Sequence, residues 1–461
     1  MENKEEPLRL HRQWRGKLET VPKMRIATRE DLAVAYTPGV AEPCRAIADD
    51  PDAAYAYTMK ANTVAVVSDG SAVLGLGNIG PLAALPVMEG KCALFKAFGG
   101  VNAVPVCLDT QDVDEIVETV IRIAPAFGGV NLEDISAPRC FEVERRLVEA
   151  LDIPVFHDDQ HGTAIVVLSG VINALRLVGK RKEECRVVVN GAGSAGIAIA
   201  KLLLSYGFRH LTLVDRCGIV NSRSEGINEA QRAMLAVTNL DDAEGGLADA
   251  LAGADVLVGV SAPGIVSADM VRSMNDDAVI FAMANPEPEI YPDEAKAAGA
   301  RVVGTGRSDF PNQINNVVAF PGIFKGALEG RARRITEEMK LAAAQALADL
   351  VSDEELSEDF IMPEPFDPRA VERVAKAVRD CAARERGGKL CCSRWTRAAA
   401  SAAAGAWRTA WVRTCGWRRA SRACGGAASC AGTAWPCARR RRCPSPASTW
   451  PMWSPPRPRP R

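Results

Sequence analysis

One segment restricts the fold of this 461-residue chain more than any other, because it joins a strand, a glycine-rich turn, a helix and a second strand. The strand Arg186–Asn190 runs into the glycine turn GAGSAG, residues 191–196, and the apolar run IAIAKLLLSYG follows. The next apolar run, LTLVD, ends at Asp215. This order predicts a Rossmann-type domain, in which a dinucleotide binds against the turn and the N-terminus of the helix.

Each residue of the glycine turn has an expected part in binding. Gly191 permits the tight turn, Gly193 lets the backbone approach the pyrophosphate, and Gly196 allows the helix to pack closely. Ser194 and Ala195 open the helix, whose N-terminus faces the negative charge of the phosphates. The alternative is a glycine turn that serves packing alone.

Asp215, at the end of the second strand, is expected to bind the hydroxyl groups of the adenine ribose. A carboxylate at this position disfavours the 2′-phosphate of NADP, although the neighbouring Arg216 could partly offset this effect. NAD is therefore the predicted cofactor, with NADP as the alternative.

Other apolar runs extend this domain and predict another one before it. Each run is short and ends at an acid or a turn residue, as buried parallel strands do. Between them, apolar residues recur at helical spacing in 112–129 and 139–152, and the predicted helix 162–178 ends at Gly179. The further predicted strands are residues 64–67, 103–108, 129–132 and 153–156 in the first domain and 211–214, 255–260, 278–282 and 301–303 in the second.

The chain is therefore predicted to be an α/β protein with three regions. Residues 1–160 form an N-terminal α/β domain, and residues 161–386 form a doubly wound Rossmann-like domain closed by helices at 331–350 and 368–384. Residues 387–461 form a disordered, low-complexity tail. No run of 18 apolar residues, signal-peptide core or paired cysteine spacing is found before the tail, so we expect a cytoplasmic protein outside membranes.

The last 75 residues differ sharply in composition from the rest. They contain no Asp or Glu but 15 Lys or Arg, seven of the eight Trp and seven of the 14 Cys. Without these 75 residues, the chain contains 41 Lys and Arg and 57 Asp and Glu, so residues 1–386 carry a net charge of about −16. We interpret the tail, rich in Arg, Ala, Trp, Cys and Pro, as an out-of-frame product of a GC-rich gene. The alternative is a basic arm that attracts nucleic acid, and no other part is expected to do so.

Acidic side chains follow two predicted strands of the first domain. Glu133 and Asp134 follow one strand, and Asp158 and Asp159 follow the next. Carboxylates from two strand ends can converge on one cation, and oxygen ligands suit Mg²⁺ or Mn²⁺. Zinc is disfavoured because the chain has only four His, and no His or Cys pair has the spacing of a zinc site. The alternative is that these acids only cap helices.

Several longer motifs resemble those of one enzyme family. They are YTPGVAEPC (36–44), SDGSAVLGLGNIGPLAALPVMEGK (68–91), NLEDI (131–135), FHDDQHGTA (156–164), NGAGSAG (190–196), FAMANP (281–286) and GRSDFPNQINNVVAFPG (306–322). Through them the chain resembles short-form bacterial malic enzymes over residues 8–385. The resemblance implies a homodimer that converts L-malate and NAD into pyruvate, carbon dioxide and NADH with the help of Mg²⁺ or Mn²⁺.

The resemblance also implies a part for each candidate active-site residue. Lys91 is expected to take the proton of the C2 hydroxyl group, Asp158 to hold Lys91, and Tyr36 to protonate C3 of the enol. The implied metal ligands are Glu133, Asp134 and Asp159. Without the resemblance, Tyr36 would be interpreted as a packing residue of a turn and Lys91 as a solvated surface residue.

Three asparagines are the implied contacts of the substrate and the nicotinamide. Asn285 matches a contact to both, and Asn315, with Asn316 as a second candidate, matches the contact to the substrate carboxylate. Helix capping would explain one such Asn equally well. One departure from the family concerns Ala72, because larger members carry an Arg there for the malate carboxylate, so another donor must bind it.

Two other hypotheses stay open from the sequence alone. In a malolactic reaction, tightly held NADH would reduce the product to lactate, and no net NADH would form. In the other hypothesis, the basic tail governs a nucleic-acid-binding or defective protein, and its binding would be sensitive to salt.

Overall fold

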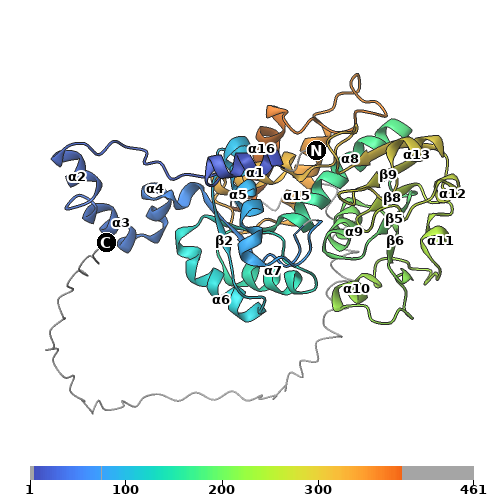
Figure 1. Cartoon of the computed structure of the whole chain (residues 1–461), viewed down its shortest axis with the longest axis horizontal. Coiled ribbons are helices and arrows are strands. Elements are labelled where there is room, and N and C mark those ends of the chain that lie inside the picture. Colours follow the sequence, from blue (N-terminus) through green and yellow to red (C-terminus); the bar gives the residue numbers. More distant parts are fainter. Residues whose placement is uncertain (1–4, 74, 387–461) are drawn as a thin grey trace, which may run out of the picture. The chain divides into compact units, whose positions relative to one another are not determined.

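The computed structural model describes residues 5–73 and 75–386 (Figure 1). The predicted tail, residues 387–461, lies outside these described residues. The described part contains a four-stranded and a six-stranded sheet, both built mainly from parallel strands with helices between them. The predicted α/β class with a doubly wound domain is therefore confirmed.

Residues 5–62 form helices and turns before the first strand, and no residue of these helices is buried. A capping box starts one of them, because the Thr28 side chain accepts from the Asp31 N–H at 3.0 Å and Asp31 accepts from the Thr28 N–H at 3.0 Å. Local hydrogen bonds, rather than packing, thus set this helix. The elements are α1 Glu5–Trp14, α2 Arg29–Ala35, α3 Ala41–Asp49, η1 Pro51–Ala53, α4 Ala54–Tyr57 and η2 Met59–Asn62.

The first sheet has the strand order β2-β1-β3-β4, and all its strands are parallel. Side chains alternate across it: Val64 and Val66 join the core that contains Phe95 of α5, whereas Ala65 and Val67 join the core under α6 and α7. The four predicted strands are confirmed. Their bounds are β1 Thr63–Ser68, β2 Asn102–Cys107, β3 Gly129–Leu132 and β4 Val155–His157, and the helices are α5 Gly80–Gly99, α6 Val113–Ile123, η3 Ala124–Ala126 and α7 Arg139–Ala150.

The second sheet has the order β10-β9-β8-β5-β6-β7, with only the short β7 antiparallel. The chain winds outward in both directions from the neighbours β5 and β8, so a crevice opens at their carboxyl ends, where nucleotides bind in such sheets. Here too the predicted strands are confirmed, and β7 was not predicted. The bounds are β5 Arg186–Asn190, β6 His210–Asp215, β7 Gly218–Ile219, β8 Val256–Gly259, β9 Ala278–Ala282 and β10 Ala300–Thr305.

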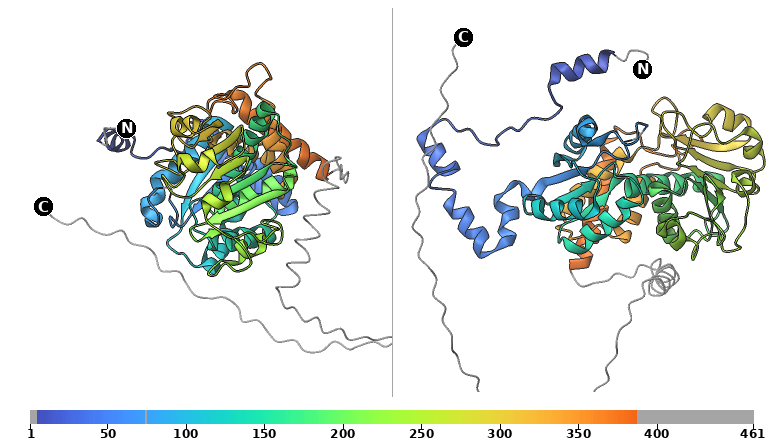
Figure 2. Two further views of the ribbon diagram at one scale, coloured as in Figure 1. Left: turned by 90° about the vertical axis from the view of Figure 1, so that its right-hand side faces the viewer. Right: turned by 60° about the horizontal axis from the view of Figure 1, so that its bottom comes forward.

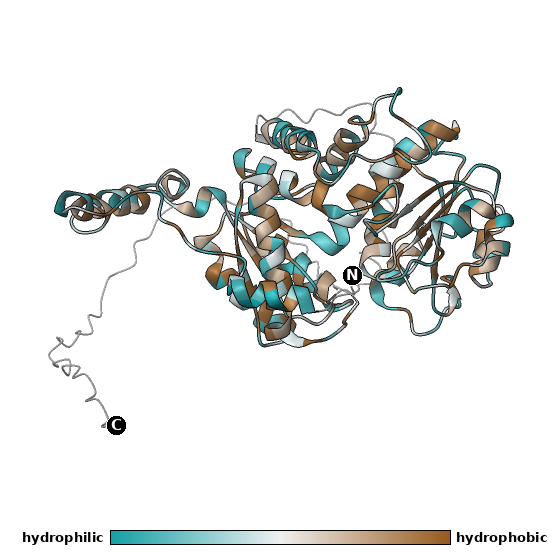
Figure 3. Cartoon of the chain, turned by 45° about the horizontal axis from the view of Figure 1, so that its top comes forward, coloured by the Kyte–Doolittle hydropathy of each residue, from teal (hydrophilic) through white to brown (hydrophobic). Residues whose placement is uncertain are grey.

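Helices flank the second sheet on both faces (Figure 2). In β5, Val187 and Val189 pack with α8 and α9, whereas Val188 packs in the separate core of α11, α12 and α13. The strands are therefore apolar on both faces, as their brown colour in Figure 3 shows. The helices are α8 Thr163–Val178, α9 Ser194–Tyr206, α10 Glu229–Met234, α11 Leu247–Leu251, α12 Ala268–Arg272 and α13 Pro292–Ala297.

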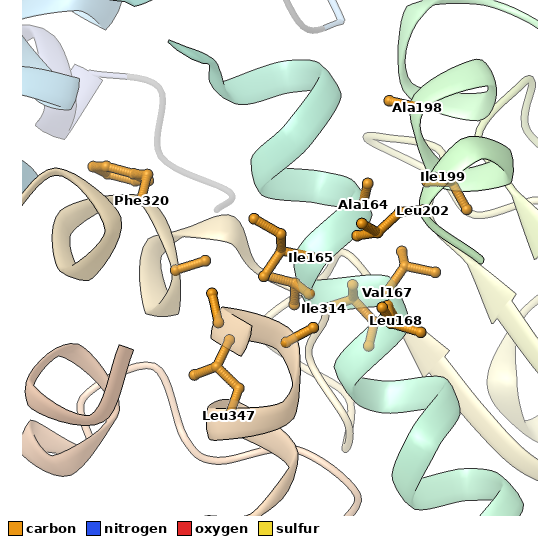
Figure 4. Packing of buried hydrophobic residues seen from close by; sticks show 14 of the residues in the cluster. Ala164, Ile165, Val167, Leu168, Ala198, Ile199, Leu202, Ile314, Phe320 and Leu347 are labelled. Atoms are coloured by element: carbon orange, nitrogen blue, oxygen red, sulfur yellow. The ribbon is translucent and has the colours of Figure 1, made fainter. Parts of the chain in front are cut away.

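Helix α8 lies at the centre of one core that includes side chains of both sheets. Figure 4 shows Ile165 and Leu168 of α8 in this core, between Leu202 of α9 and Leu347 of the later helix α15, Glu337–Ala348. By length and composition alone, Asp158–Val178 could cross a membrane, but 67% of that window is buried inside the protein, as in an ordinary core helix. As predicted, the helix ends at Gly179, which adopts a left-handed conformation with φ of +67°.

Three helices close the fold, and one differs from its prediction. Helix α15 begins at Glu337 rather than at residue 331, because the Thr336 hydroxyl accepts from the Met339 N–H at 3.4 Å and caps the helix there. The helix predicted at 368–384 is confirmed. The bounds are η5 Asn316–Val318, α14 Phe320–Glu329, α15 Glu337–Ala348 and α16 Pro368–Arg386.

Candidate active site

The candidate site centres on Lys91, a lysine of α5 that is only 8% exposed. Its ammonium group lies 2.9 Å from Glu133 Oε1 and 2.5 Å from Asp158 Oδ2. Glu133 follows β3, and Asp158 follows β4 in a π-helical turn, η4 Asp158–Gly162. Because β3 and β4 are parallel neighbours, their carboxyl ends bring these two acids to one edge of the first sheet.

The second half of the chain completes the surroundings of Lys91. Asn316, the first residue of η5, donates a hydrogen bond from Nδ2 to Asp158 Oδ2 at 2.5 Å. The Lys91 ammonium also lies 4.2 Å from the centre of the Phe320 ring, where a cation–π contact stabilises its charge. We call Lys91, Glu133, Asp158 and Asn316 the lysine cluster.

Two further acids border the lysine cluster. The Asp134 backbone N–H donates to Asp159 Oδ2 at 2.8 Å, so the two strand ends are joined directly. Asp134 Oδ2 and Asp158 Oδ1 are buried and have no hydrogen-bond partner among the described residues. Such buried acceptors are costly unless a cation or a ligand satisfies them.

The electrostatics of the four acids follow from their burial. Burial, with the repulsion of Asp159 and Glu133, raises the pKa of Asp134 to about 8, whereas Lys91 opposes the increase. Burial also raises the pKa of Glu133 to about 7, of Asp158 to about 7 and of Asp159 to about 6, again against the opposing charge of Lys91. Burial would lower the pKa of Lys91, but the charges of Asp158 and Glu133 outweigh it and raise that pKa.

The oxygen donors of these acids suit a hard cation, although the acids are not arranged as a closed metal site. In the part of the chain that the structure describes, no three His, Cys, Asp or Glu side chains are grouped so as to hold a metal ion. The Lys91 ammonium contacts Glu133 and Asp158 instead. The unpartnered Asp134 Oδ2 and the all-oxygen donor set nevertheless suit Mg²⁺ or Mn²⁺.

The structure separates the two asparagines that the sequence left as alternatives. Asn315 caps η5, because its Oδ1 accepts from the Val317 N–H at 3.0 Å, whereas the Asn316 side chain reaches Asp158. At Ala72, the backbone N–H donates to the Asp134 carbonyl at 2.9 Å. The arginine beside this loop is Arg139, whose Nη2 donates to Asp69 at 3.1 Å and whose Nε is buried without a partner among the described residues.

Tyr36 takes no part in the hydrogen bonds of the lysine cluster. It forms the C-terminal cap of α2, and 68% of its surface is exposed. Among the described residues of the single chain, no hydrogen bond, ion pair or ring contact therefore links Tyr36 to the lysine cluster, and its role as the proton donor to C3 stays a prediction.

The glycine turn has the geometry that a dinucleotide needs. Gly191 has φ of +112°, and a Cβ there would lie 2.5 Å from the Val260 carbonyl oxygen. A Cβ on Gly196 would lie 1.9 Å from the Gly191 carbonyl oxygen, whereas one on Gly193 would meet nothing within 4 Å. Ser194 and Ala195 begin α9 directly after this open position. The space beside Gly193 is where a pyrophosphate would approach the backbone.

Asp215 ends β6, and its carboxylate is held from two sides. Oδ1 accepts from the Cys217 N–H at 2.8 Å, and Oδ2 accepts from Gln231 Nε2 at 3.3 Å. The Gln231 amide also donates to the Ala192 carbonyl of the glycine turn at 3.1 Å. Gln231 could not be found from the sequence, because the local pattern with Asn228 shows only that a helix begins there.

Asn285 lies three residues beyond β9, at the carboxyl edge of the second sheet. Its side chain is partly exposed and donates from Nδ2 to the Met283 carbonyl at 3.2 Å. This position borders the crevice beyond β5 and β8. Together, the fold and the site define a two-domain α/β protein in which a Rossmann-type domain adjoins a buried lysine–carboxylate cluster, as in nucleotide-dependent enzymes.

Comparisons with known proteins identify the family within this class of protein. Residues 15–148 match the family described as malic enzyme, N-terminal domain, and residues 160–383 match malic enzyme, NAD binding domain. The bifunctional malic/malolactic enzyme of Bacillus subtilis is 58% identical over 83% of this chain and 93% of the relative. The NAD-dependent malic enzyme of Geobacillus stearothermophilus is 58% identical over 80% of this chain and 77% of the relative.

A solved structure agrees with these matches. The NAD-dependent malic enzyme of Thermotoga maritima is 49% identical and has a TM-score of 0.78, over 81% of this chain and 98% of that chain. The chain therefore belongs to the malic enzyme family, as its motifs predicted.

Proposed function

We propose that this protein oxidises and decarboxylates L-malate to pyruvate and carbon dioxide while it reduces NAD. The observation that carries the proposal is the buried Lys91, held between Glu133 and Asp158 next to a Rossmann-type domain. A buried amine with a hydrogen-bonded acid beside it can accept and pass on a proton. The neighbouring dinucleotide crevice supplies the hydride acceptor.

Lys91 takes the proton of the C2 hydroxyl group as hydride leaves C2 for the nicotinamide. Asp158 and Asn316 hold the lysine in place through the contacts described above. Glu133, Asp134 and Asp159 would hold Mg²⁺ or Mn²⁺. When bound, this cation would neutralise the acids that keep Lys91 charged and would polarise the C2 oxygen of the substrate.

The remaining contacts complete the assignment of the candidate residues. Asn285, at the edge of the crevice, contacts the nicotinamide and the substrate. Asn315 and Asn316 donate to a carboxylate of malate from the segment that reaches the lysine cluster. The glycine turn and Asp215 bind the pyrophosphate and the adenine ribose, so NAD is preferred and NADP is the alternative.

The proton donor Tyr36 acts within a homodimer. The helices of residues 5–62 bury none of their side chains, and many large apolar side chains of these helices and of the segments between them are exposed. An exposed apolar surface of this extent marks a contact with another protein. A second copy of the chain that covers it would bring Tyr36 to the lysine cluster of its partner, where C3 of the enol is protonated. The exposed large apolar residues of 5–62 are Leu8, Trp14, Leu18, Val21, Met24, Ile26, Leu32, Val34, Tyr36, Val40, Tyr57 and Met59.

The location of the protein is proposed to be the cytoplasm. All seven cysteines in the described part of the chain are free thiols, as a reducing compartment requires. The acidic body disfavours nucleic acid as a partner, and the basic residues 387–461 lie outside the described residues.

The experiment that tests the function measures NADH and pyruvate formed from L-malate by the purified full chain. Equal amounts of both products, formed with Mn²⁺ and lost with a chelator, are expected. Pyruvate without NADH, or activity that a chelator leaves unchanged, would contradict the proposal.

A malolactic reaction is the second candidate function. The observation that favours it is the 58% identity to the Bacillus subtilis relative, which is a bifunctional malic/malolactic enzyme. Lactate that accumulates without net NADH would identify this reaction.

A further inference from the structure

Glu289 is a fully buried acid that the proposed reaction does not use. It lies in the segment after β9, and its side chain turns back to the carboxyl edge of the second sheet. Oε1 accepts a hydrogen bond from the Ser261 N–H at 2.9 Å, and Oε2 accepts one from the Ala284 N–H at 3.0 Å. One carboxylate therefore joins the segments that leave two neighbouring strands, β8 and β9.

The connection extends to a third strand. Ser261 Oγ accepts from Asn190 Nδ2 at 2.9 Å, and Asn190 is the last residue of β5. Gly259 leaves room for the acid, because a Cβ there would lie 2.6 Å from Glu289 Cδ. Glu289 thus ties together the strand ends that border the nucleotide crevice.

Backbone N–H groups, rather than a cation, satisfy this carboxylate. Its partners are the N–H groups of Ser261 and Ala284 and, at 3.4 Å from Oε1, the Ser261 hydroxyl. Burial raises its pKa, and the hydrogen bonds from Ala284 and Ser261 oppose that rise. Both oxygens must accept at once, so a group that offers only one acceptor would leave a backbone N–H unsatisfied.

We propose that Glu289 is a positioning residue that shapes the nicotinamide end of the dinucleotide crevice. By holding the Ala284 N–H, it sets the backbone that carries Asn285, and by holding Ser261 it fixes the segment that leaves the neighbouring strand β8. The adenosine end binds at the glycine turn and Asp215. Glu289 contacts neither of them directly and reaches the glycine turn only through Ser261, which borders Asn190 and Gly191. This inference rests on the proposed NAD-dependent function and adds a residue to it.

The test compares NAD with ADP-ribose, which lacks the nicotinamide, by calorimetric titration of the full-length chain. Glu289→Gln has nearly the same shape but places an amide donor against one backbone N–H. We expect the Kd for NAD to rise about tenfold, while the Kd for ADP-ribose stays within about twofold of wild type. Glu289→Asp keeps both acceptors on a side chain one methylene shorter, and a smaller rise for NAD alone is expected.

Asp255 offers a control at the other edge of the same sheet. It is also buried, just before β8, and accepts from the Arg186 N–H at 2.8 Å and from Asn275 Nδ2 at 3.0 Å. Unlike Glu289, it also forms an ion pair with Lys180 at 2.9 Å. Asp255→Asn should lower the melting temperature without changing the ratio of the two dissociation constants.

Each outcome decides one proposal. The inference would be wrong if Glu289→Gln and Glu289→Asp weakened the binding of NAD and of ADP-ribose equally, or if they weakened the binding of neither ligand. The proposed function would stand in that case, because the wild type would still bind NAD. If Asp255→Asn changed the ratio as much as Glu289→Gln, a general loss of sheet stability would be the cause. A wild-type chain that binds ADP-ribose but not NAD would overturn the proposed function as well.

Discussion

Replacing two glycines of the same turn by alanine, one at a time, should separate an effect on the stability of the protein from an effect on its binding of the cofactor. At Gly196 an added Cβ would lie 1.9 Å from the Gly191 carbonyl oxygen, whereas ordinary contacts begin near 3.4 Å. The first turn of α9 and the glycine turn would have to move apart by roughly 1.5 Å to accept it. At Gly193 nothing lies within 4 Å, so alanine fits without any movement.

The sizes of the two effects follow from this geometry. Overpacking of this kind costs about 1–3 kcal/mol, and each kcal/mol lowers the melting temperature of a domain of this size by about 2–4 °C. Gly196→Ala should therefore melt several degrees below wild type and bind NAD more weakly. Gly193→Ala should melt like wild type, but its methyl group would stand where the pyrophosphate approaches, so the Kd for NAD should rise about tenfold or more.

Thermal unfolding without NAD and calorimetric titration with NAD measure the two effects separately. The reasoning fails if Gly196→Ala melts like wild type, because the close approach to Gly191 would then be relieved at no cost. It also fails if Gly193→Ala binds NAD as tightly as wild type, because the pyrophosphate would then lie elsewhere.

Three further predictions concern the catalytic residues, the metal and the pH dependence. Lys91→Ala and Tyr36→Phe should each lower kcat at least a hundredfold without changing the Kd for NAD. Mixed dimers of the two variants should regain activity, since one of their two sites would hold both intact residues. No regain of activity would exclude a Tyr36 supplied by the partner. Removing divalent cations should abolish NADH formation, and Mn²⁺ should restore it, whereas a chelated enzyme with full activity would refute the metal role. Burial would raise the pKa of Glu144, but the charge of His161, 2.7 Å away, lowers this pKa from 4.5 to about 2. On the order of 3 kcal/mol of stability should therefore be present above pH 4.5 and be lost between pH 4.5 and 2. In urea unfolding, the stability of Glu144→Gln should not show this dependence on pH.

The strands and the glycine turn could be predicted because their signals are local. A strand that is buried on both faces must be apolar at every position, as 64–67 and 278–282 are, so the pattern is visible without knowledge of the partner strands. The turn at 191–196 likewise follows from the positive φ of Gly191 and the close contact at Gly196. The N-terminal helices were not predicted, since they bury no residue and show no such pattern.

The partners of the site residues could not be predicted from local sequence. Lys91 and Asp158 are 67 residues apart, and Asp158 and Asn316 are 158 apart, so only the packing of separate elements brings them together. Asn315 and Asn316 have the same chemistry, and the start of η5 decides which one caps the helix and which one reaches the acid. The motifs predicted that Lys91 and Tyr36 act on the same substrate, but Tyr36 is exposed in the single chain.

By itself, the sequence determined the α/β class, the Rossmann-type turn, the acidic strand ends and membership in the malic enzyme family, because each rests on a local pattern or a long motif. Only the tertiary structure decided that Lys91 is buried and charged between two acids, that Gln231 holds Asp215, and that Glu289 joins three strand ends. The physical reason is that hydrogen bonds and burial depend on distances in space. Residues far apart in the chain acquire those distances only when the two sheets and their helices have packed.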